Sequence, residues 1–497
     1  MGASYTASDR GGNVLDLPFR SAKQLASAIK ARKIGCAELL DLYLKRVEKF
    51  NPRLNAIIVT DIPAAHKRAK AADAALRKKK PLGPLHGVPM TIKESFNVAG
   101  LPTTWGAPEL KNNIAASNAV AVDRFLGAGA VLFGKTNVPL NLADWQSFNV
   151  VYGTTNNPWD TTLSPGGSSG GSAAALAAGL TGLEAGSDIG SSIRNPAHYC
   201  GVYGHKPTWG VCTPRGHALP GVVAASDISA IGPLARSAED LDLALSVMAG
   251  PDEIDGAGWK LALPAPRQKS LREFRVSVML EDPNSEVDGA VKDRIQAVAD
   301  FLAKKKAKVS DSARPAIDTA ESHRVFITIL RAATSGRMTP EVFQQNLDAL
   351  GKLGADDHSY FALMTRGNVL RHRDWLKLNN ARHQMRLKWA EFFKDWDLLI
   401  CPPAASAACP HDHAGERWQR GITVNGKRVP ATDQMFWAGY SGMAYLPSTV
   451  APDGFTPSGL PVGVQIVGPQ YADRSCIQFA RLLEKEFQAF VPPKGYE

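Results

Sequence analysis

The spacing of apolar residues in the first part of the chain predicts a pair of helices. Ser21 and Gln24 have the spacing of a capping box, which predicts a helix that ends at Gly35. Apolar residues recurring at helical spacing predict a second helix over 37–50. The same periodicity predicts further helices over 64–80, 119–126, 173–180, 237–248, 287–305 and 375–394.

A shorter period, of two residues, indicates a strand over 85–93. Val88, Met90 and Ile92 alternate with other residues there, and the run ends in Lys93. A lysine at the end of a buried strand is costly unless it is neutral or paired, so we predict a neutral Lys93. Other segments rich in β-formers predict strands over 130–133, 274–280 and 397–401, and a hairpin with an Asn-Gly turn over 422–429.

The order of these elements predicts one α/β domain over residues 1–497. The chain is 44% hydrophobic and 21% charged, which is typical of a globular protein with a large core. No segment has the composition of a linker, although the length exceeds that of most single domains. The segment 252–375 is rich in predicted helices and has no glycine clusters, so we interpret it as a variable insertion between a core at about 80–250 and a C-terminal part at about 395–490.

Charge and cysteine usage exclude several classes of partner. The net charge of +10 derives partly from lysines clustered at predicted helix ends, which complement the helix dipole, so we do not predict nucleic-acid binding. No apolar run reaches membrane-spanning length, and the N-terminus lacks a secretion signal, so we expect a cytoplasmic protein that does not bind membranes. The six cysteines lack metal-ligand spacing, and His411 and His413 lack a third ligand, so we assign no metal or cofactor.

One stretch, residues 164–194, has the composition of a reaction centre. Its first cluster places Ser168 and Ser169 between paired glycines, ahead of a predicted helix of very small residues. Its second cluster places Ser191 and Ser192 after Gly190. Hydroxyls beside orientable backbone N–H groups supply a nucleophile and an oxyanion hole, which acyl transfer requires. A solvated serine-rich loop is the competing interpretation on composition alone.

Two other motifs match this chain by letter, and we reject both. Residues 129–136 satisfy the Walker A pattern, but Ala-Val-Leu-Phe between its glycines predicts a core strand and not an open phosphate loop. Residues 166–170 satisfy the Gly-x-Ser-x-Gly pattern of α/β-hydrolases. The segment before them is turn-like, whereas that motif must follow an apolar strand.

Five motifs in order make the chain resemble the amidase signature family. They are Gly87–Lys93, Gly134–Asn137, the Gly-Gly-Ser-Ser-Gly-Gly loop at 166–171, Ser187–Arg194 and Cys200–Thr208. The resemblance covers about 20–250 and resumes near 390, where Gly459–Gly468 is similar to the family's closing strand. It implies a single α/β/α domain around a large mixed, twisted sheet.

The resemblance also implies roles for individual residues. Ser192 would be the nucleophile, Ser168 the bridging serine after a cis peptide bond, and Lys93 the base. The oxyanion hole would consist of the backbone N–H groups of Ile189, Gly190, Ser191 and Ser192. Ser191 stands where the family more often has glycine, so its side chain could narrow the site. We assign Ser169, Asp188 and Arg194 to holding the two loops.

The resulting hypothesis is a serine amidase that hydrolyses the C–N bond of a small-molecule carboxamide. Alternatives are the amidase component of a tRNA-dependent amidotransferase, a hydrolase mainly of carbamates or esters, and a catalytically inactive binding protein. A homodimer is compatible with the sequence. For the substrate pocket we predict Leu142, Trp145, Phe436 and Trp437, and hence an apolar, aromatic pocket with little to pair a charged group.

Overall fold

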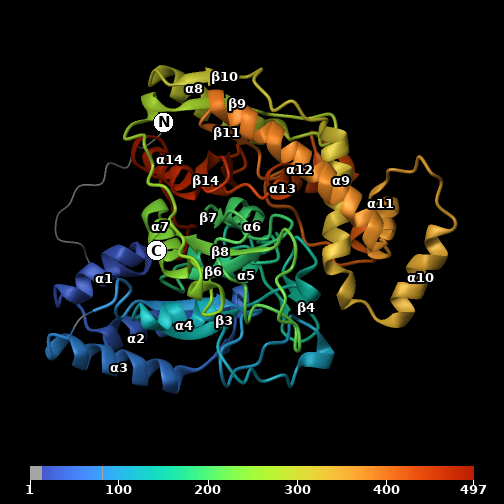
Figure 1. The fold of residues 1–497 in the computed structure, drawn as a ribbon. Coiled ribbons are helices and arrows are strands. Elements are labelled where there is room, and N and C mark those ends of the chain that lie inside the picture. The colour runs from blue at the N-terminus through green and yellow to red at the C-terminus, as the bar shows by residue number, and fades with distance from the viewer. Residues whose placement is uncertain (1–13, 81) are drawn as a thin grey trace.

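An eight-stranded sheet forms the centre of the molecule (Figure 1). The structure is a computed structural model that describes residues 14–80 and 82–497, so residues 1–13, on which the targeting expectation partly depends, lie outside it. The sheet order is β10-β9-β11-β15-β14-β7-β8-β6. The strands are β6 (Glu184–Asp188), β7 (Tyr203–Lys206), β8 (Ala230–Ala235), β9 (Arg275–Val278), β10 (Lys308–Ser310), β11 (Leu398–Cys401), β14 (Ser448–Phe455) and β15 (Pro461–Val467).

The sheet is mixed, as predicted. Strand β9 runs parallel to β10 and β11, whereas the other neighbouring strands pair antiparallel. Nearly continuous runs of buried residues, such as Leu398–Cys401 and Pro461–Val467, explain why these segments form central strands. Helices that pack on or beside this sheet are α5 (Gly170–Ala177), α6 (Arg194–Cys200), α7 (Ala238–Met248), α8 (Gly289–Lys304), α13 (Met435–Gly442) and α14 (Asp473–Glu486).

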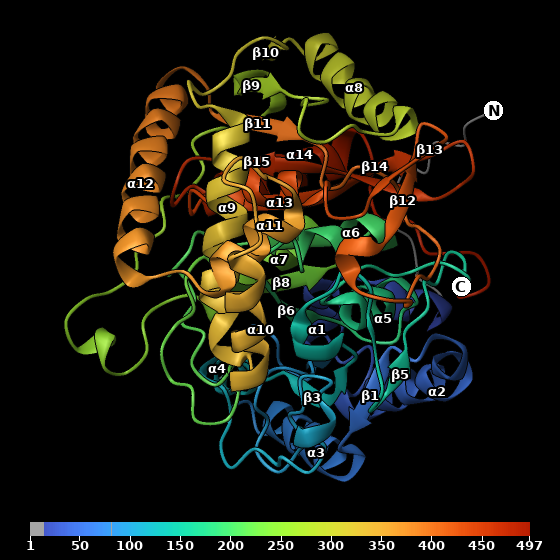
Figure 2. The ribbon, with the colours of Figure 1, turned by 90° about the vertical axis from the view of Figure 1, so that its right-hand side faces the viewer.

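A smaller sheet lies among the N-terminal helices, at the opposite end of the molecule from α8 and β10 (Figures 1 and 2). Its order is β1-β3-β2, with β2 parallel to β3. The segment that matches Walker A forms strand β3, as predicted. The bounds are β1 (Ile57–Thr60), β2 (Pro89–Lys93), β3 (Val131–Thr136), α1 (Ala22–Lys30), α2 (Cys36–Leu54), α3 (Ile62–Arg77) and α4 (Val120–Gly127).

The segment 252–375 divides between the sheet and a helical flank. Its first part adds to the central sheet β9, which was predicted as a strand over 274–280, and β10, which was not predicted. Its second part forms one side of the molecule, with α10 lying outermost (Figure 1). The helices of this flank are α9 (Thr319–Thr334), α10 (Pro340–Leu350), α11 (Tyr360–Asn368) and the following α12 (His372–Asp395).

Two short hairpins complete the fold. The Asn-Gly hairpin is present as β12 (Gly421–Val424) and β13 (Lys427–Pro430), as predicted. The other hairpin joins β4 (Phe148–Asn149) and β5 (Gly153–Thr154). All six cysteines are free thiols, and no helix in the described ranges is long and apolar enough to cross a membrane.

Candidate active site

Lys93 is the last residue of strand β2, and its side chain is completely buried. Its Nζ lies 2.6 Å from Ser168 Oγ and 3.0 Å from Ser187 Oγ. Strand β2 brings the lysine to this position because β2 pairs in parallel register with β3, with Lys93 opposite Thr136. The amine therefore contacts hydroxyl groups and has no carboxylate as a direct partner among the described residues.

Burial lowers the pKa of Lys93 well below that of a free lysine. The negative charges of Asp188 and Glu184 oppose this shift, and the positive charge of Arg337 adds to it. Glu184 is itself fully buried, and burial raises its pKa to about 8, so at neutral pH it contributes little negative charge. The neutral amine, which can accept a proton, is thereby favoured at a much lower pH than in solution.

The serine loop that faces Lys93 is held by close backbone contacts. The peptide bond between Gly167 and Ser168 is cis. A Cβ at Gly167 would lie 2.5 Å from the carbonyl oxygen of Asp144, so only glycine fits at this position. Ser147 fastens the loop on the other side, since its Oγ donates to Gly166 O at 3.0 Å and accepts from the N–H of Gly170 at 3.1 Å.

The second serine cluster forms the turn between strand β6 and helix α6. The carboxylate of Asp188 accepts hydrogen bonds from the backbone N–H groups of Ser191, Ile193 and Arg194, at 2.9, 3.1 and 3.3 Å. The two serine loops are joined directly, because the N–H of Ser169 donates to the carbonyl of Ser192 at 3.1 Å. Ser192 is 5% exposed and lines two cavities.

A buried ion pair between Asp188 and Arg194 supports this turn. Arg194 donates to Asp188 through Nε at 3.0 Å and Nη2 at 2.9 Å. Its remaining N–H groups reach Ser441 and Gln465, which ties the turn to α13 and β15. Burial alone would raise the pKa of Asp188, but the guanidinium of Arg194 and the hydrogen bonds hold it below its usual range.

The backbone donors around Ser192 differ in part from the predicted oxyanion hole. The N–H of Ser191 already donates to Asp188, so its prediction as an oxyanion donor is wrong for this structure. Within the described residues, the N–H groups of Ile189, Gly190 and Ser192 have no hydrogen-bond partner. Ser191 has a φ of 75° and a fully buried side chain, and it lines neither cavity, so it does not narrow the site as expected.

The larger cavity beside Ser192 has a volume of about 610 Å³ and is also lined by Ile189 and Gly190. Leu142 and Trp145, two of the residues predicted for the substrate pocket, line this cavity, and the indole Nε1 of Trp145 donates to Gly190 O at 2.7 Å. Phe436 and Trp437 do not line it. They are 2% and 0% exposed and pack in the core, and Met435 of the same helix reaches the cavity in their place.

The smaller cavity, of about 170 Å³, lies on the side of Ser168. It is lined by Ser168, Ser187 and Ser192, so the hydroxyl that contacts Lys93 and the predicted nucleophile border the same space. Among the described residues, no group of three His, Cys, Asp or Glu side chains is placed to hold a metal ion.

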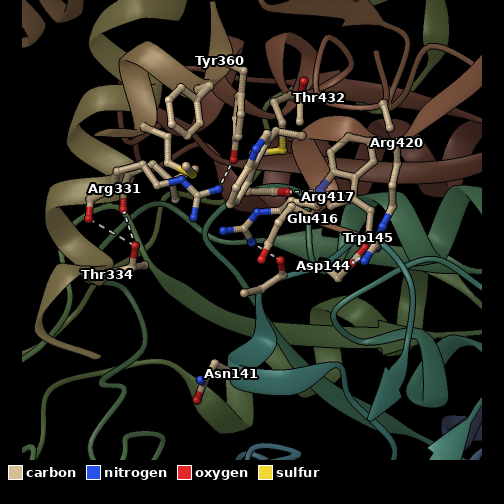
Figure 3. Close-up of a pocket in the computed structure, with 18 of the residues that line it drawn as sticks. Asn141, Asp144, Trp145, Arg331, Thr334, Tyr360, Glu416, Arg417, Arg420 and Thr432 are labelled. Carbon is tan, nitrogen blue, oxygen red and sulfur yellow. Dashed lines mark hydrogen bonds and ion pairs between the residues drawn. The ribbon is translucent and has the colours of Figure 1, made fainter. Parts of the chain in front are cut away.

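The wall of the larger cavity is more strongly charged than predicted (Figure 3). Arg331 of helix α9, Arg337 after it and Arg417 before β12 all line this cavity, with Tyr360 of α11. The sequence analysis missed these residues, since no local motif marks them. The expectation that the pocket offers little to pair a charged group is therefore wrong.

Comparisons with known proteins agree with this architecture. Residues 38–477 match the sequence pattern of the Amidase family. The chain is 33% identical to an acylamidase of Rhodococcus erythropolis over 94% of this chain and 96% of that protein. It is 30% identical to a subunit of the glutamyl-tRNA(Gln) amidotransferase of Bdellovibrio bacteriovorus, over 95% and 97% of the two chains.

A bacterial aryl acylamidase of the amidase signature family has the same fold. Its structure superposes with a TM-score of 0.79 at 24% identity, over 94% of this chain and 96% of that one. The chain therefore belongs to the amidase signature family, whose enzymes hydrolyse amides.

Proposed function

We propose that the enzyme hydrolyses small carboxamides through an acyl-enzyme on Ser192, with Ser168 and Lys93 relaying the proton. The observation that carries this proposal is the 2.6 Å contact of a buried Lys93 amine with Ser168 Oγ, on a cavity that Ser192 also lines. Ser192 supplies the attacking oxygen because it borders both cavities. It also follows Ile189 and Gly190 in the sequence, whose backbone N–H groups have no hydrogen-bond partner in the described structure.

The reaction begins when neutral Lys93 accepts the proton of Ser168, which accepts that of Ser192. Ser192 Oγ then forms a bond to the amide carbon, and the negative oxygen is stabilised by the N–H groups of Ile189, Gly190 and Ser192. The proton returns through Ser168 to the nitrogen of the departing amine as the C–N bond breaks. Water, deprotonated by the same relay, releases the carboxylic acid and restores Ser192.

The apolar part of the larger cavity supports amides with an apolar or aryl body. Leu142, Trp145 and Met435 lie near Ser192, and Met338 and Met364 extend the apolar lining. Each well-buried methylene adds about 0.8 kcal/mol of binding free energy. In a homologous series of acyl anilides, kcat/KM is expected to rise with chain length until the cavity is filled, and acetanilide is expected to be the poorest substrate.

A fluorophosphonate that reacts with activated serines tests the nucleophile. We expect the label on Ser192 in the wild-type chain and in Ser191→Ala, and no label in Ser192→Ala. Ser191 is the matched control because it is the adjacent serine, is also buried and lies outside both cavities. Labelling of another serine, or anilide hydrolysis by Ser192→Ala at the wild-type rate, contradicts the proposal.

The amidotransferase alternative is favoured by one specific observation, the 30% identity to a glutamyl-tRNA(Gln) amidotransferase chain. An enzyme component of that kind would release ammonia from glutamine. Assays of the isolated chain with acyl anilides, matched esters and carbamates, and glutamine separate these activities. Turnover of glutamine with none of the anilides would favour the alternative, and a much larger kcat/KM for esters or carbamates would reassign the substrate class.

A further inference from the structure

Arg331 is a buried cation without an acidic partner in the described part of the chain. Its side chain lies in the wall of the larger cavity, and the residue is 8% exposed. Nη2 donates to the hydroxyl of Tyr360, and the guanidinium carbon lies 5.3 Å from the centre of that ring. Its Nε is buried and has no hydrogen-bond partner. A buried charge left in this state is unfavourable, so the site has spare binding capacity for an anion.

The charged groups nearest to Arg331 are cations. Burial lowers its pKa well below that of a free arginine, and the positive charges of Arg417 and then Arg337 lower it further. Figure 3 shows Arg331 and Arg417 reaching the cavity from opposite sides. Arg417 donates to the carbonyl of Ala143, and its own buried Nε lacks a partner.

No acid of the same cavity wall forms an ion pair with either arginine among the described residues, although the negative charges of Asp144 and Glu416 oppose the lowering of the pKa of Arg417 by burial. Asp144 is engaged with Arg420, whose Nη1 lies 2.6 Å from its carboxylate. Asp412 lies 3.9 Å from Arg428, and Glu416 is exposed. Helix α9 also brings Arg331 close to the proposed reaction centre. A Cβ at Gly190 would lie 3.9 Å from Leu330, the residue before Arg331.

From this arrangement we infer that the larger cavity binds amide substrates that carry a carboxylate remote from the scissile bond, paired by Arg331 and Arg417. The planar fork of a guanidinium matches the two oxygens of a carboxylate, and Tyr360 orients the fork of Arg331. This inference rests on the proposed amidase function and adds the substrate class. The apolar wall would hold the body of the substrate and the arginines its charged end.

Matched substrates test the inference by kinetics. Glutaranilic acid, its neutral carboxamide and a trimethylammonium analogue of the same length differ only in the terminal group. A second set places the same three groups on the aniline ring, so that either end of the amide can reach the arginines. For one set at least, we expect kcat/KM to be about 30-fold or more higher for the carboxylate than for the carboxamide, and lowest for the cation.

Variants assign the preference to the cavity. Arg331→Gln should reduce the carboxylate preference, which is the ratio of the kcat/KM values for the carboxylate and the carboxamide, to within about 3-fold of unity, and Arg331→Lys should keep part of it. Lys388→Gln is the control, because this substitution also removes one positive charge. Lys388 is exposed on α12 and lines neither cavity. An equal preference in wild type and Arg331→Gln, or an equal loss in Lys388→Gln, overturns the inference.

A binding measurement separates this inference from the proposed function. Calorimetry of Ser192→Ala with the acid and the carboxamide of each set requires no turnover. Tighter binding of one of the acids that is lost with the additional Arg331→Gln change supports the carboxylate site even when wild type hydrolyses neither compound. Equal binding of acid and carboxamide in both sets overturns it even when the amidase activity is established.

Discussion

The two serine loops and the wall of the larger cavity differ in whether their charged side chains are paired. In the loops, the carboxylate of Asp188 accepts hydrogen bonds from three backbone N–H groups and from Nε and Nη2 of Arg194, so its charge is fully paired. In the wall, Arg331 and Arg417 are adjacent cations with unpartnered N–H groups. The difference indicates that the loops need no ligand to pair their charges, whereas a bound anion would pair the charges of the wall.

The origin of the residues differs in the same way. Asp188 and Arg194 lie six residues apart in one turn, and the loops belong to two neighbouring stretches of sequence. The cavity wall combines residues of α9, α11 and the segment before β12, which are separated by tens of residues. The two serine loops are therefore formed by residues close together in the sequence, whereas the wall depends on how distant helices pack.

Replacing Lys93 should give the largest effect, because the loops depend on one proton acceptor. Lys93→Met removes the acceptor but keeps the volume, and we expect a loss of about 10²–10⁴-fold in kcat. The wild-type kcat should rise about tenfold per pH unit below the lowered pKa of Lys93 and level off above it, since only the neutral amine accepts a proton. Stopped assays over a pH series at saturating substrate measure both.

Lys135 on the neighbouring strand is the matched control for this prediction. It is also completely buried, with its pKa lowered to about 8 by burial, but its Nζ bonds to Thr103 and Pro102 and not to a serine of the loops. Lys135→Met should lower the free energy of unfolding and leave the pH dependence of kcat unchanged. A profile flat through neutral and mildly alkaline pH, with chemistry rate-limiting, would show that Lys93 is not the base.

Breaking the Asp188–Arg194 pair should have the next largest effect. Arg194→Met leaves a carboxylate buried without its cation, which costs about 3–5 kcal/mol of unfolding free energy. Urea unfolding with fluorescence detection measures the loss, and anilide turnover should fall with it because the turn carries Ser192. Lys292→Met, which breaks a partly exposed pair with Glu281, should cost at most about 1 kcal/mol. Equal losses in the two variants would disprove the supporting role of Arg194.

A change at the border of the two regions should have the smallest effect. A Cβ at Gly190 would meet the terminal methyl of Met435 at 2.9 Å, so Gly190→Ala requires only a flexible side chain to move. We expect a loss of less than about tenfold in kcat/KM for bulky anilides and little for acetanilide. Adding Met435→Ala should restore kcat/KM for the bulky anilides. If it does not, the loss in Gly190→Ala does not arise from the contact with Met435.

Local patterns in the sequence account for the predictions that hold. Alternation over residues 85–93 placed Lys93 at the end of a buried strand, and glycine on both sides of Ser168 predicted a tight loop before a small-residue helix. The capping box at Ser21 and the Asn-Gly hairpin are present for the same reason. Each of these depends on neighbouring residues alone, because backbone angles and hydrogen bonds of caps, turns and strands are set over a few positions.

Only the tertiary structure decided which apolar residues border the larger cavity and which are core. Phe436 and Trp437 look like pocket residues in the sequence, but the turn of α13 directs them inward and Met435 outward. The pairing of Ser191 N–H with Asp188 and the approach of Arg331 to Arg417 are likewise invisible in a linear pattern. The sequence by itself predicted the groups that we propose to react, because they lie in short motifs with their own backbone support. Packing of helices far apart in the chain decided the charge of the cavity, because a guanidinium acquires or lacks a partner only when those helices meet.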